Sequence, residues 1–312
     1  MIFALLIAWA ALALWFDSSY PKALTTLILL VSISVFLYIE RWLMRFIALG
    51  LQFAAVLSWW LQIAPSNSRN WQEDVARLPA VEINGDQIII HNVRDFDYRS
   101  ETDFTPHWEE RIYYLSQLHG VDLTLSDWGA AAILHTIVSW DFGPGQYLAI
   151  SIETRKKVGD SYSAIRGFFR QYELYYVVAD ERDVIGVRAK YRGEDLHMYR
   201  IRMPPSVVRS VFLSYAAEIN RLHVQPEWYN AATDNCTTSI RLQVKNAGAE
   251  KPLNWRLFAN KFLDKLLYSR GVLNTSFSFA ALKARSDITA AACSAIKDPN
   301  FSEVIRSNLP LR

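Results

Sequence analysis

Long apolar stretches dominate residues 1–65 of the chain. Residues 1–16 and 23–38 carry no charged side chain, and residues 43–63 carry only Arg45. A membrane-spanning helix needs about 20 largely apolar residues, with a range of roughly 17–25, so the third stretch is long enough. The first two become long enough when a few flanking residues are included. We therefore expect this region to be a membrane anchor of three hydrophobic helices.

Basic residues decide how such an anchor is oriented, because the connections richest in Lys and Arg stay in the cytoplasm. The first connection holds only Lys22, whereas the second holds Arg41, with Arg45 just inside the third stretch. The N-terminus is then cytoplasmic, and three crossings deliver everything after Pro65 to the outer face. In a Gram-negative bacterium that face is the periplasm. We expect a multi-pass inner-membrane protein with a periplasmic C-terminal domain.

Two other interpretations of the anchor are open. Residues 1–16 can be a secretory signal, although they lack its basic N-terminal region. Residues 43–63 can instead lie flat in the membrane interface, since Arg45 and two glutamines interrupt the stretch. The neighbouring Trp59 and Trp60 resemble the aromatic belt at the end of a membrane span, which favours crossing.

Residues 66–312 carry the pattern of a folded α+β domain. Asn84-Gly85-Asp86 separates two apolar runs, which is typical of a β-hairpin, and residues 134–142 and 147–154 predict a second hairpin around a Gly-Pro-Gly-Gln turn. The other expected elements are a strand at 92–99, a helix at 108–118, a loop or short strand at 121–128, strands at 173–178, 184–188 and 197–201, a helix at 206–222 opened by Pro204-Pro205, and helices and loops from 253 onwards. Short strands at this spacing predict one antiparallel sheet with a helical C-terminal tail.

Composition and charge narrow the range of functions. Lys and Arg number 33 and Asp and Glu number 31, which gives a net charge of +2, and no basic run is interleaved with aromatic side chains. A nucleic-acid partner is therefore excluded. The spacing of His107, His119, His197 and His223 does not match a zinc site. We expect no metal and no cofactor.

Cys236 is the leading candidate for catalysis. Asp234 and Asn235 are good N-caps for a helix that continues over residues 238–244, so Cys236 lies in the first helical turn. The unpaired N–H groups and the positive end of the helix dipole stabilise a thiolate, which is the nucleophilic form of cysteine. The alternative is a structural role in which Cys236 forms a disulfide with Cys293.

A cysteine nucleophile needs a base, and the base needs a third group that holds its orientation. His135 lies on the first strand of the second hairpin, and Glu153 lies near it on the returning strand. One register of this hairpin puts Thr154 opposite His135, and a one-residue shift puts Glu153 there; both registers stay open. Glu153 and Asn235 are the two candidates for the third group.

Four motifs, taken together, resemble a known family. They are His135-Thr136-Ile137-Val138-Ser139-Trp140-Asp141-Phe142, Ala149-Ile150-Ser151-Ile152-Glu153-Thr154-Arg155, Tyr172-Glu173-Leu174 with Asp180-Glu181-Arg182-Asp183, and Tyr229-Asn230 with Asn235-Cys236-Thr237-Thr238. In order and spacing they are similar to the Lnb N-terminal periplasmic domain family. The resemblance implies a circularly permuted papain-like cysteine enzyme with a Cys236–His135 pair. The founding member of the family is a bacterial lipoprotein N-acyltransferase, which implies thioacyl chemistry on membrane lipids or acylated lipoproteins.

Four further residues are candidate substrate contacts. Arg155, which two lysines follow, can face anionic head groups or belong to a solvated turn. Glu181 and Arg182 can clamp a substrate or can form an ion-pair network with other charges such as Arg188. Tyr229 belongs to the same motif as the candidate nucleophile.

These observations leave three functions open. The first is a membrane-anchored periplasmic acyl-transfer enzyme in which Cys236 attacks an acyl carbonyl, His135 acts as base and then as acid, and helix N–H groups stabilise the oxyanion. Its partners would be membrane lipids or acylated lipoproteins. The second is a cell-wall amidase or peptidase that uses the same pair. The third is a periplasmic binding module in which Cys236 is bridged to Cys293. The sequence does not indicate which oligomeric state the protein has.

Overall fold

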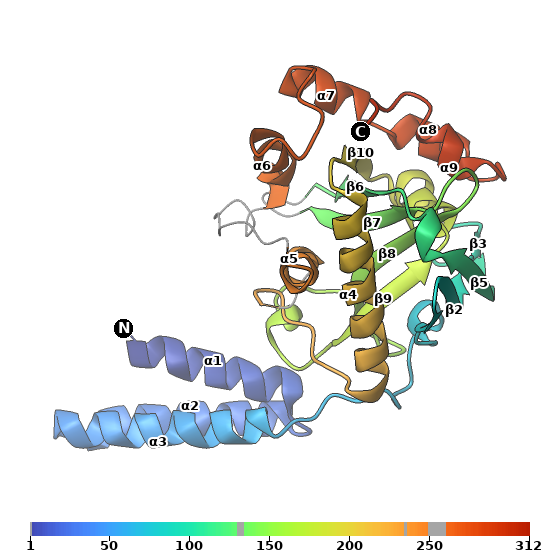
Figure 1. Cartoon of the computed structure of the whole chain (residues 1–312). Helices are drawn as coiled ribbons and strands as arrows, with labels where there is room; N and C mark the ends of the chain where they lie inside the picture. Colours follow the sequence, from blue (N-terminus) through green and yellow to red (C-terminus); the bar gives the residue numbers. More distant parts are fainter. Residues whose placement is uncertain (1, 130–133, 234–235, 249–259) are drawn as a thin grey trace.

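The computed structural model describes residues 2–129, 134–233, 236–248 and 260–312, and it contains a helical bundle joined to a mixed α+β body (Figure 1). The bundle consists of α1 (Ile2–Asp17), α2 (Pro21–Tyr38) and α3 (Trp42–Leu61). It projects from one side of the body, and α1 ends, α2 begins and α3 ends at the side that faces the body.

The outer surface of the bundle is largely apolar and fits a membrane anchor. By length and composition α2 and α3 can each cross a membrane, whereas α1, with 16 residues, is about 24 Å long. Inside the bundle, the Gln52 side-chain amide donates hydrogen bonds to the carbonyl of Ile28 at 2.8 Å and to Ser32 Oγ at 3.0 Å. Polar contacts of this kind join helices that are otherwise apolar. Much of the outer apolar surface is exposed, which is typical of helices that lipid covers.

The body is built on an eight-stranded sheet with the order β1-β2-β9-β8-β7-β6-β10, in which β5 also pairs with β2. All the strand pairs are antiparallel except β2 with β9. The strands of the sheet are β1 (Ala80–Asn84), β2 (Gln87–Arg94), β5 (Trp108–Tyr114), β6 (Gly120–Asp127), β7 (His135–Asp141), β8 (Tyr147–Arg155), β9 (Glu173–Ala179) and β10 (Asp195–Ile201). A separate two-stranded ribbon pairs β3 (Asp97–Tyr98) with β4 (Phe104–Thr105).

Helices cover both faces of the sheet because its central strands are apolar on both sides. On one face, α4 (Pro205–Val224) and α5 (Cys236–Asn246) pack on residues such as Val138 and Trp140. On the other face, Ile137 packs against the layer that includes α8 (Thr289–Ser294) and α9 (Phe301–Val304). The remaining helical pieces are α6 (Leu263–Ser269), α7 (Phe279–Arg285), the 3-10 turns Glu73–Val75, Leu115–Gln117, Arg166–Phe168 and Asn260–Phe262, and the π-helical turns Arg182–Gly186 and Arg188–Arg192.

Most of the expected elements are confirmed. Both hairpins form, Pro205 opens α4, and Cys236 is the first described residue of a helix. The sheet is mostly antiparallel, as expected. The stretch expected as a loop or short strand at 121–128 is the fully paired strand β6. The strand expected at 92–99 is divided between the end of β2 and the two residues of β3.

Two expectations were wrong. The predicted helix at 108–118 is the strand β5, because its backbone pairs along the free edge of β2 and buries Tyr113 against Phe142. The predicted strand at 184–188 is helical instead, and it buries Val184 and Ile185 in the layer that contains α8. A short apolar run fits either structure, and tertiary contacts decided both cases.

We expect the buried ion pair between Arg94 and Asp183 to be needed for stability. The guanidinium lies 2.6 Å from Asp183, whose carboxylate also accepts a hydrogen bond from the N–H of Phe96 at 2.8 Å. Asp183→Ala leaves a buried cation without its partner, so the free energy of unfolding should fall by about 3–5 kcal/mol. Thermal unfolding of the detergent-solubilised chain measures this loss. The double variant Arg94→Met, Asp183→Leu should recover most of it, and an unchanged melting temperature in Asp183→Ala would contradict the prediction.

Candidate active site

A cleft of about 800 Å³ opens at the end of the sheet where β7 begins and α5 starts. His135, Glu153 and Cys236 all line it. Residues 135 and 236 are far apart in the sequence, and the packing of α5 on β7 and β8 brings them together. The cleft thus contains three of the residues that the sequence indicates as candidates for catalysis.

Cys236 is buried at the N-terminal end of α5. Its thiol interacts with His135 and with the backbone of Thr136, and its Sγ lies 3.9 Å from Thr237 Oγ1. The first turn of a helix also places backbone N–H groups and the positive end of the helix dipole near the thiol. Asn235, the other candidate for the third catalytic group, lies outside the described residues.

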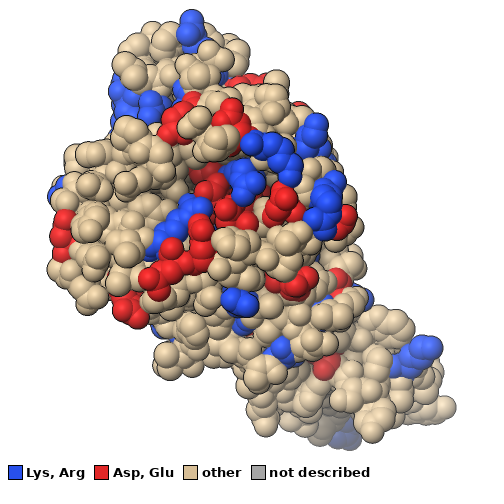
Figure 2. Space-filling view, turned by 90° about the vertical axis from the view of Figure 1, so that its right-hand side faces the viewer, with Lys and Arg blue, Asp and Glu red and all other residues tan. Residues whose placement is uncertain are grey.

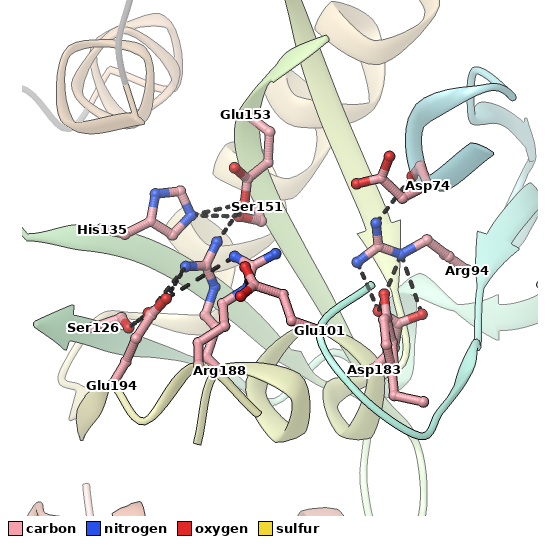
Figure 3. A network of polar contacts seen from close by, with 12 residues as sticks. Asp74, Arg94, Glu101, Ser126, His135, Ser151, Glu153, Asp183, Arg188 and Glu194 are labelled. Carbon is pink, nitrogen blue, oxygen red and sulfur yellow. Dashed lines mark hydrogen bonds and ion pairs between the residues drawn. The ribbon is translucent and has the colours of Figure 1, made fainter. Parts of the chain in front are cut away.

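The register of β7 against β8 settles which residue faces His135. Ile137 pairs with Ser151, so the same register places Glu153 directly across from His135. His135 Nε2 lies 3.0 Å from Glu153 Oε1 and 2.6 Å from Ser151 Oγ, and the Ser151 hydroxyl donates to the same carboxylate oxygen at 2.7 Å (Figure 3). With Nε2 held by the acid, Nδ1 is the ring nitrogen left for the thiol.

The electrostatics of the cleft favour a thiolate beside an imidazolium. Burial disfavours the charged histidine, but the negative charge of Glu153 and the contact with the thiol outweigh burial and raise the pKa of His135 to about 9. Burial likewise opposes the thiolate, but the hydrogen bond and charge of His135 lower the pKa of Cys236 below its ordinary value. Because the folded pKa of His135 is raised, the charged pair stabilises the fold below the ordinary histidine pKa and is lost as the pH rises through about 9.

A buried arginine, Arg188, also binds the carboxylate of Glu153. Arg188 begins the second π-helical turn and donates to Glu153 at 2.7 Å through Nη2 and to Glu194 at 3.1 Å through Nη1 (Figure 3). Glu194 in turn accepts a hydrogen bond from Ser126. Burial would raise the pKa of Glu153, but His135 and Arg188 hold it well below its usual range. The sequence did not indicate Ser151 or Glu194, and it offered Arg188 only as one charge of a cluster.

The four candidate substrate contacts have different locations. Tyr229 lines the cleft beside Cys236. Arg155 is buried under the ring of Trp71 at 4.3 Å, where it donates to backbone carbonyls, so it packs the fold instead of facing head groups. Glu181 is fully buried against Arg306, and Arg182 pairs with Asp95 at 2.5 Å; neither lines the cleft. The charges of Glu181 and Arg182 are therefore used in ion pairs with Arg306 and Asp95.

The two cysteines are both free. Cys236 belongs to the core on the α5 face of the sheet, and Cys293 packs on the core of the opposite face. The disulfide that the non-catalytic alternative requires is therefore not formed.

Elsewhere among the described residues, Asp95, His107 and Glu109 place their ligand atoms within 4.8 Å of one another. Asp95 already faces the guanidinium of Arg182, so its negative charge has a partner without an ion.

Comparison with known protein families identifies the body of the molecule. The Lnb N-terminal periplasmic domain matches residues 104–261, which are 158 of the 312 residues. The chain belongs to the Lnb N-terminal periplasmic domain family, as its motifs suggested. The match contains His135, Glu153 and Cys236. Comparisons with curated proteins and with solved structures give no match.

We expect Cys236 to react with iodoacetamide at a lower pH than an ordinary thiol, because the pKa of its thiol is lowered. In His135→Ala the buried thiolate loses its charged partner, so its pKa rises, and labelling at neutral pH slows by about tenfold for each pKa unit. A Cys293→Ala background confines labelling to Cys236, and mass spectrometry gives the rate at each pH. Equal rates with and without His135 would contradict the prediction.

Glu153→Gln should lower the pKa of His135 from about 9, because burial and the charge of Arg188 lower this pKa and only the contact with Cys236 then opposes them. NMR titration of the histidine ring signals, assigned with His135→Ala, measures the change. Glu101→Gln is the matched control, since Glu101 lines the same cleft but pairs with Arg192. A His135 pKa that stays at about 9 in Glu153→Gln would show that Glu153 does not stabilise the imidazolium.

Proposed function

We propose that this protein is a membrane-anchored periplasmic cysteine enzyme that transfers an acyl group through a thioester on Cys236. The observation that carries the proposal is the contact of a buried thiol at a helix N-terminus with a histidine whose pKa is raised by an acid. This combination places a thiol whose pKa is lowered beside a histidine that is protonated at neutral pH, so a nucleophile and a proton donor share one site. A structural cysteine requires neither partner.

The reaction follows from the positions of these groups. The Cys236 thiolate attacks the acyl carbonyl carbon, a C–S bond forms, and N–H groups at the start of α5 stabilise the oxyanion. The C–O bond of the ester then breaks, and His135 gives its proton to the leaving alkoxide. In the second half, an amine or water attacks the thioester while His135 takes its proton, and the thiolate is released. Glu153 holds the imidazole orientation through both halves.

The fold of the proposed enzyme is a circularly permuted papain-like domain. In support, the nucleophile starts a helix packed on the sheet, the base lies on a central strand, and the acid lies on the neighbouring strand. The histidine precedes the cysteine in the chain, and the strands β8, β9 and β10 and the long helix α4 lie between the strand of the histidine and the helix of the cysteine. Membrane lipids or acylated lipoproteins are the proposed substrates.

We also propose that α1, α2 and α3 all cross the inner membrane and that the body lies in the periplasm. Support comes from the polarity of the bundle. Trp60 near the end of α3 donates to Asp17 at the end of α1 at 2.7 Å, and Gln171 of the body donates to the same carboxylate at 2.6 Å. The body is thus held at one end of the bundle, and Arg41 and Arg45 lie near the connection at the other end, where the cytoplasm is expected.

A trapped thioester is the direct test. The full chain in liposomes is incubated with a phospholipid or a diacylated lipopeptide that carries an alkyne-tagged acyl chain, and bound tag is detected after denaturation. We expect a label on the wild type that hydroxylamine removes, no label on Cys236→Ala, and a strongly reduced label on His135→Ala. Cys293→Ala is the control and should label like the wild type. A label that persists in Cys236→Ala, or cell-wall peptide release without acylation, would reject acyl transfer.

A further inference from the structure

The connection between β8 and β9 carries several exposed large apolar side chains, of which Val158 is the first. Tyr162, Ile165 and Phe168 have exposed fractions of 52, 60 and 47%, and we call them the apolar patch. Ile165 and Phe168 lie one 3-10 turn apart, since the N–H of Phe168 donates to the carbonyl of Ile165 at 3.1 Å. An exposed apolar cluster beside a binding cleft is typical of a surface that another apolar phase covers.

The residues that follow the patch fix its place beside the bundle. Phe169 is buried, and its ring centroid lies 5.1 Å from that of Phe16 and 6.4 Å from that of Trp9. Trp9 lies seven residues before Phe16, which is about 10 Å along α1. The backbone N–H of Arg170 donates to Asp17, and its guanidinium lies 4.2 Å from the ring centroid of Trp60. The patch therefore lies beside the end of the bundle that contacts the body. It does not lie beyond that end along the axis of the bundle.

The charge of the molecule is distributed to match this placement. Figure 2 shows the right-hand side of Figure 1, which points away from the bundle, and charged side chains of both signs gather across that face. The connection that carries the patch contains Lys156, Lys157 and Arg166 beside the one acid Asp160. Basic residues around an apolar patch suit the anionic head groups of a bilayer.

The same patch forms an edge of the cleft. Tyr162 and Phe168 line it together with Cys236, and Tyr162 also interacts with Tyr229, which lies beside the thiol. We propose that the apolar patch lies in the outer-leaflet interface and is the entrance through which a lipid acyl chain passes from the bilayer to Cys236. This inference rests on the proposed membrane anchor and, for the passage of the acyl chain, on the proposed acyl transfer.

Lipid contact is measured with a single fluorescent label, without any acyl transfer. In a Cys236→Ala, Cys293→Ala background, Ile165→Cys carries an environment-sensitive fluorophore, and the full chain is placed in liposomes of phosphatidylcholine and phosphatidylglycerol that contain a nitroxide-labelled lipid. Leu51→Cys on the exposed surface of α3 is the membrane control, and Ile112→Cys on β5 is the matched control for an exposed isoleucine far from the bundle.

We expect the label at position 165 to emit at shorter wavelength and to lose intensity to the nitroxide lipid, as the label at position 51 does. The label at position 112 should lose intensity to aqueous iodide instead. A label at position 165 that behaves like the one at position 112 would overturn the placement of the patch. A label at position 51 that the nitroxide lipid does not quench would overturn it too, because the bundle would then lie outside the bilayer.

Passage of the acyl chain is tested separately with Ile165→Asp and its matched control Ile112→Asp. Acylation of Cys236 from the bilayer should be lost in Ile165→Asp and retained in Ile112→Asp. Alkylation by iodoacetamide, which reaches the thiol from water, reports whether the Cys236–His135 pair is intact in each variant. Full acylation of Ile165→Asp would overturn the proposal that the apolar patch is the entrance for the acyl chain. Quenching at position 165 without acylation of the wild type would instead reject the proposed transfer and the passage of the chain, and would leave the membrane contact standing.

Discussion

The contact between His135 and Glu153 across β7 and β8 is the constraint on which the candidate site depends. Side chains alternate between the two faces of a strand, so a one-residue slip of this hairpin would place Thr154 opposite His135 and turn the carboxylate to the other face. The register is held along the pairs from Ile137 with Ser151 to Asp141 with Tyr147, and β8 is held again by β9 on its far side. The geometry of the candidate site at the open end of the hairpin is thus set by backbone pairing that extends to its turn.

Behind that contact, charges of alternating sign follow one another into the protein. In its ionised form, which the lowered pKa favours, Cys236 faces the imidazolium of His135, which faces Glu153, and Arg188 links Glu153 to Glu194. Each interior member of the series has an opposite charge on both sides, which is the arrangement in which buried charge costs least. Such a series adds little net stability compared with apolar packing. What it does provide is a fixed protonation state and a fixed ring orientation for the histidine, and both are requirements of nucleophilic catalysis.

Local chemistry explains why parts of this structure were predictable. The Asn84-Gly85 turn, the Gly-rich turn after Phe142 and the helix that Pro205 opens each depend on a few neighbouring residues, and each forms as expected. The candidate nucleophile was recognisable because its helix start is also encoded locally. The hairpin register, the strand at β5 and the π-helical turn of Arg188 depend on partners far along the chain. Glu194 could not be distinguished from a surface acid, since its burial appears only when β6 and the π-helical turns meet.

Side-chain contacts hold the body in one orientation on the bundle, and this orientation matters for any reaction at the cleft. A domain joined to a membrane helix by a flexible linker samples many orientations, and only a few of them would point its cleft at the bilayer. Here the body is docked as well as tethered: Phe169 packs between Trp9 and Phe16, and Gln171 and Trp60 both donate to Asp17. Trp228, just before the loop that leads to Cys236, adds a hydrogen bond to the carbonyl of Ile63 at 3.0 Å. These contacts restrict rotation of the cleft relative to the bundle. The entropy of orienting the cleft is therefore lost once, when the protein folds, and not again each time that a substrate binds.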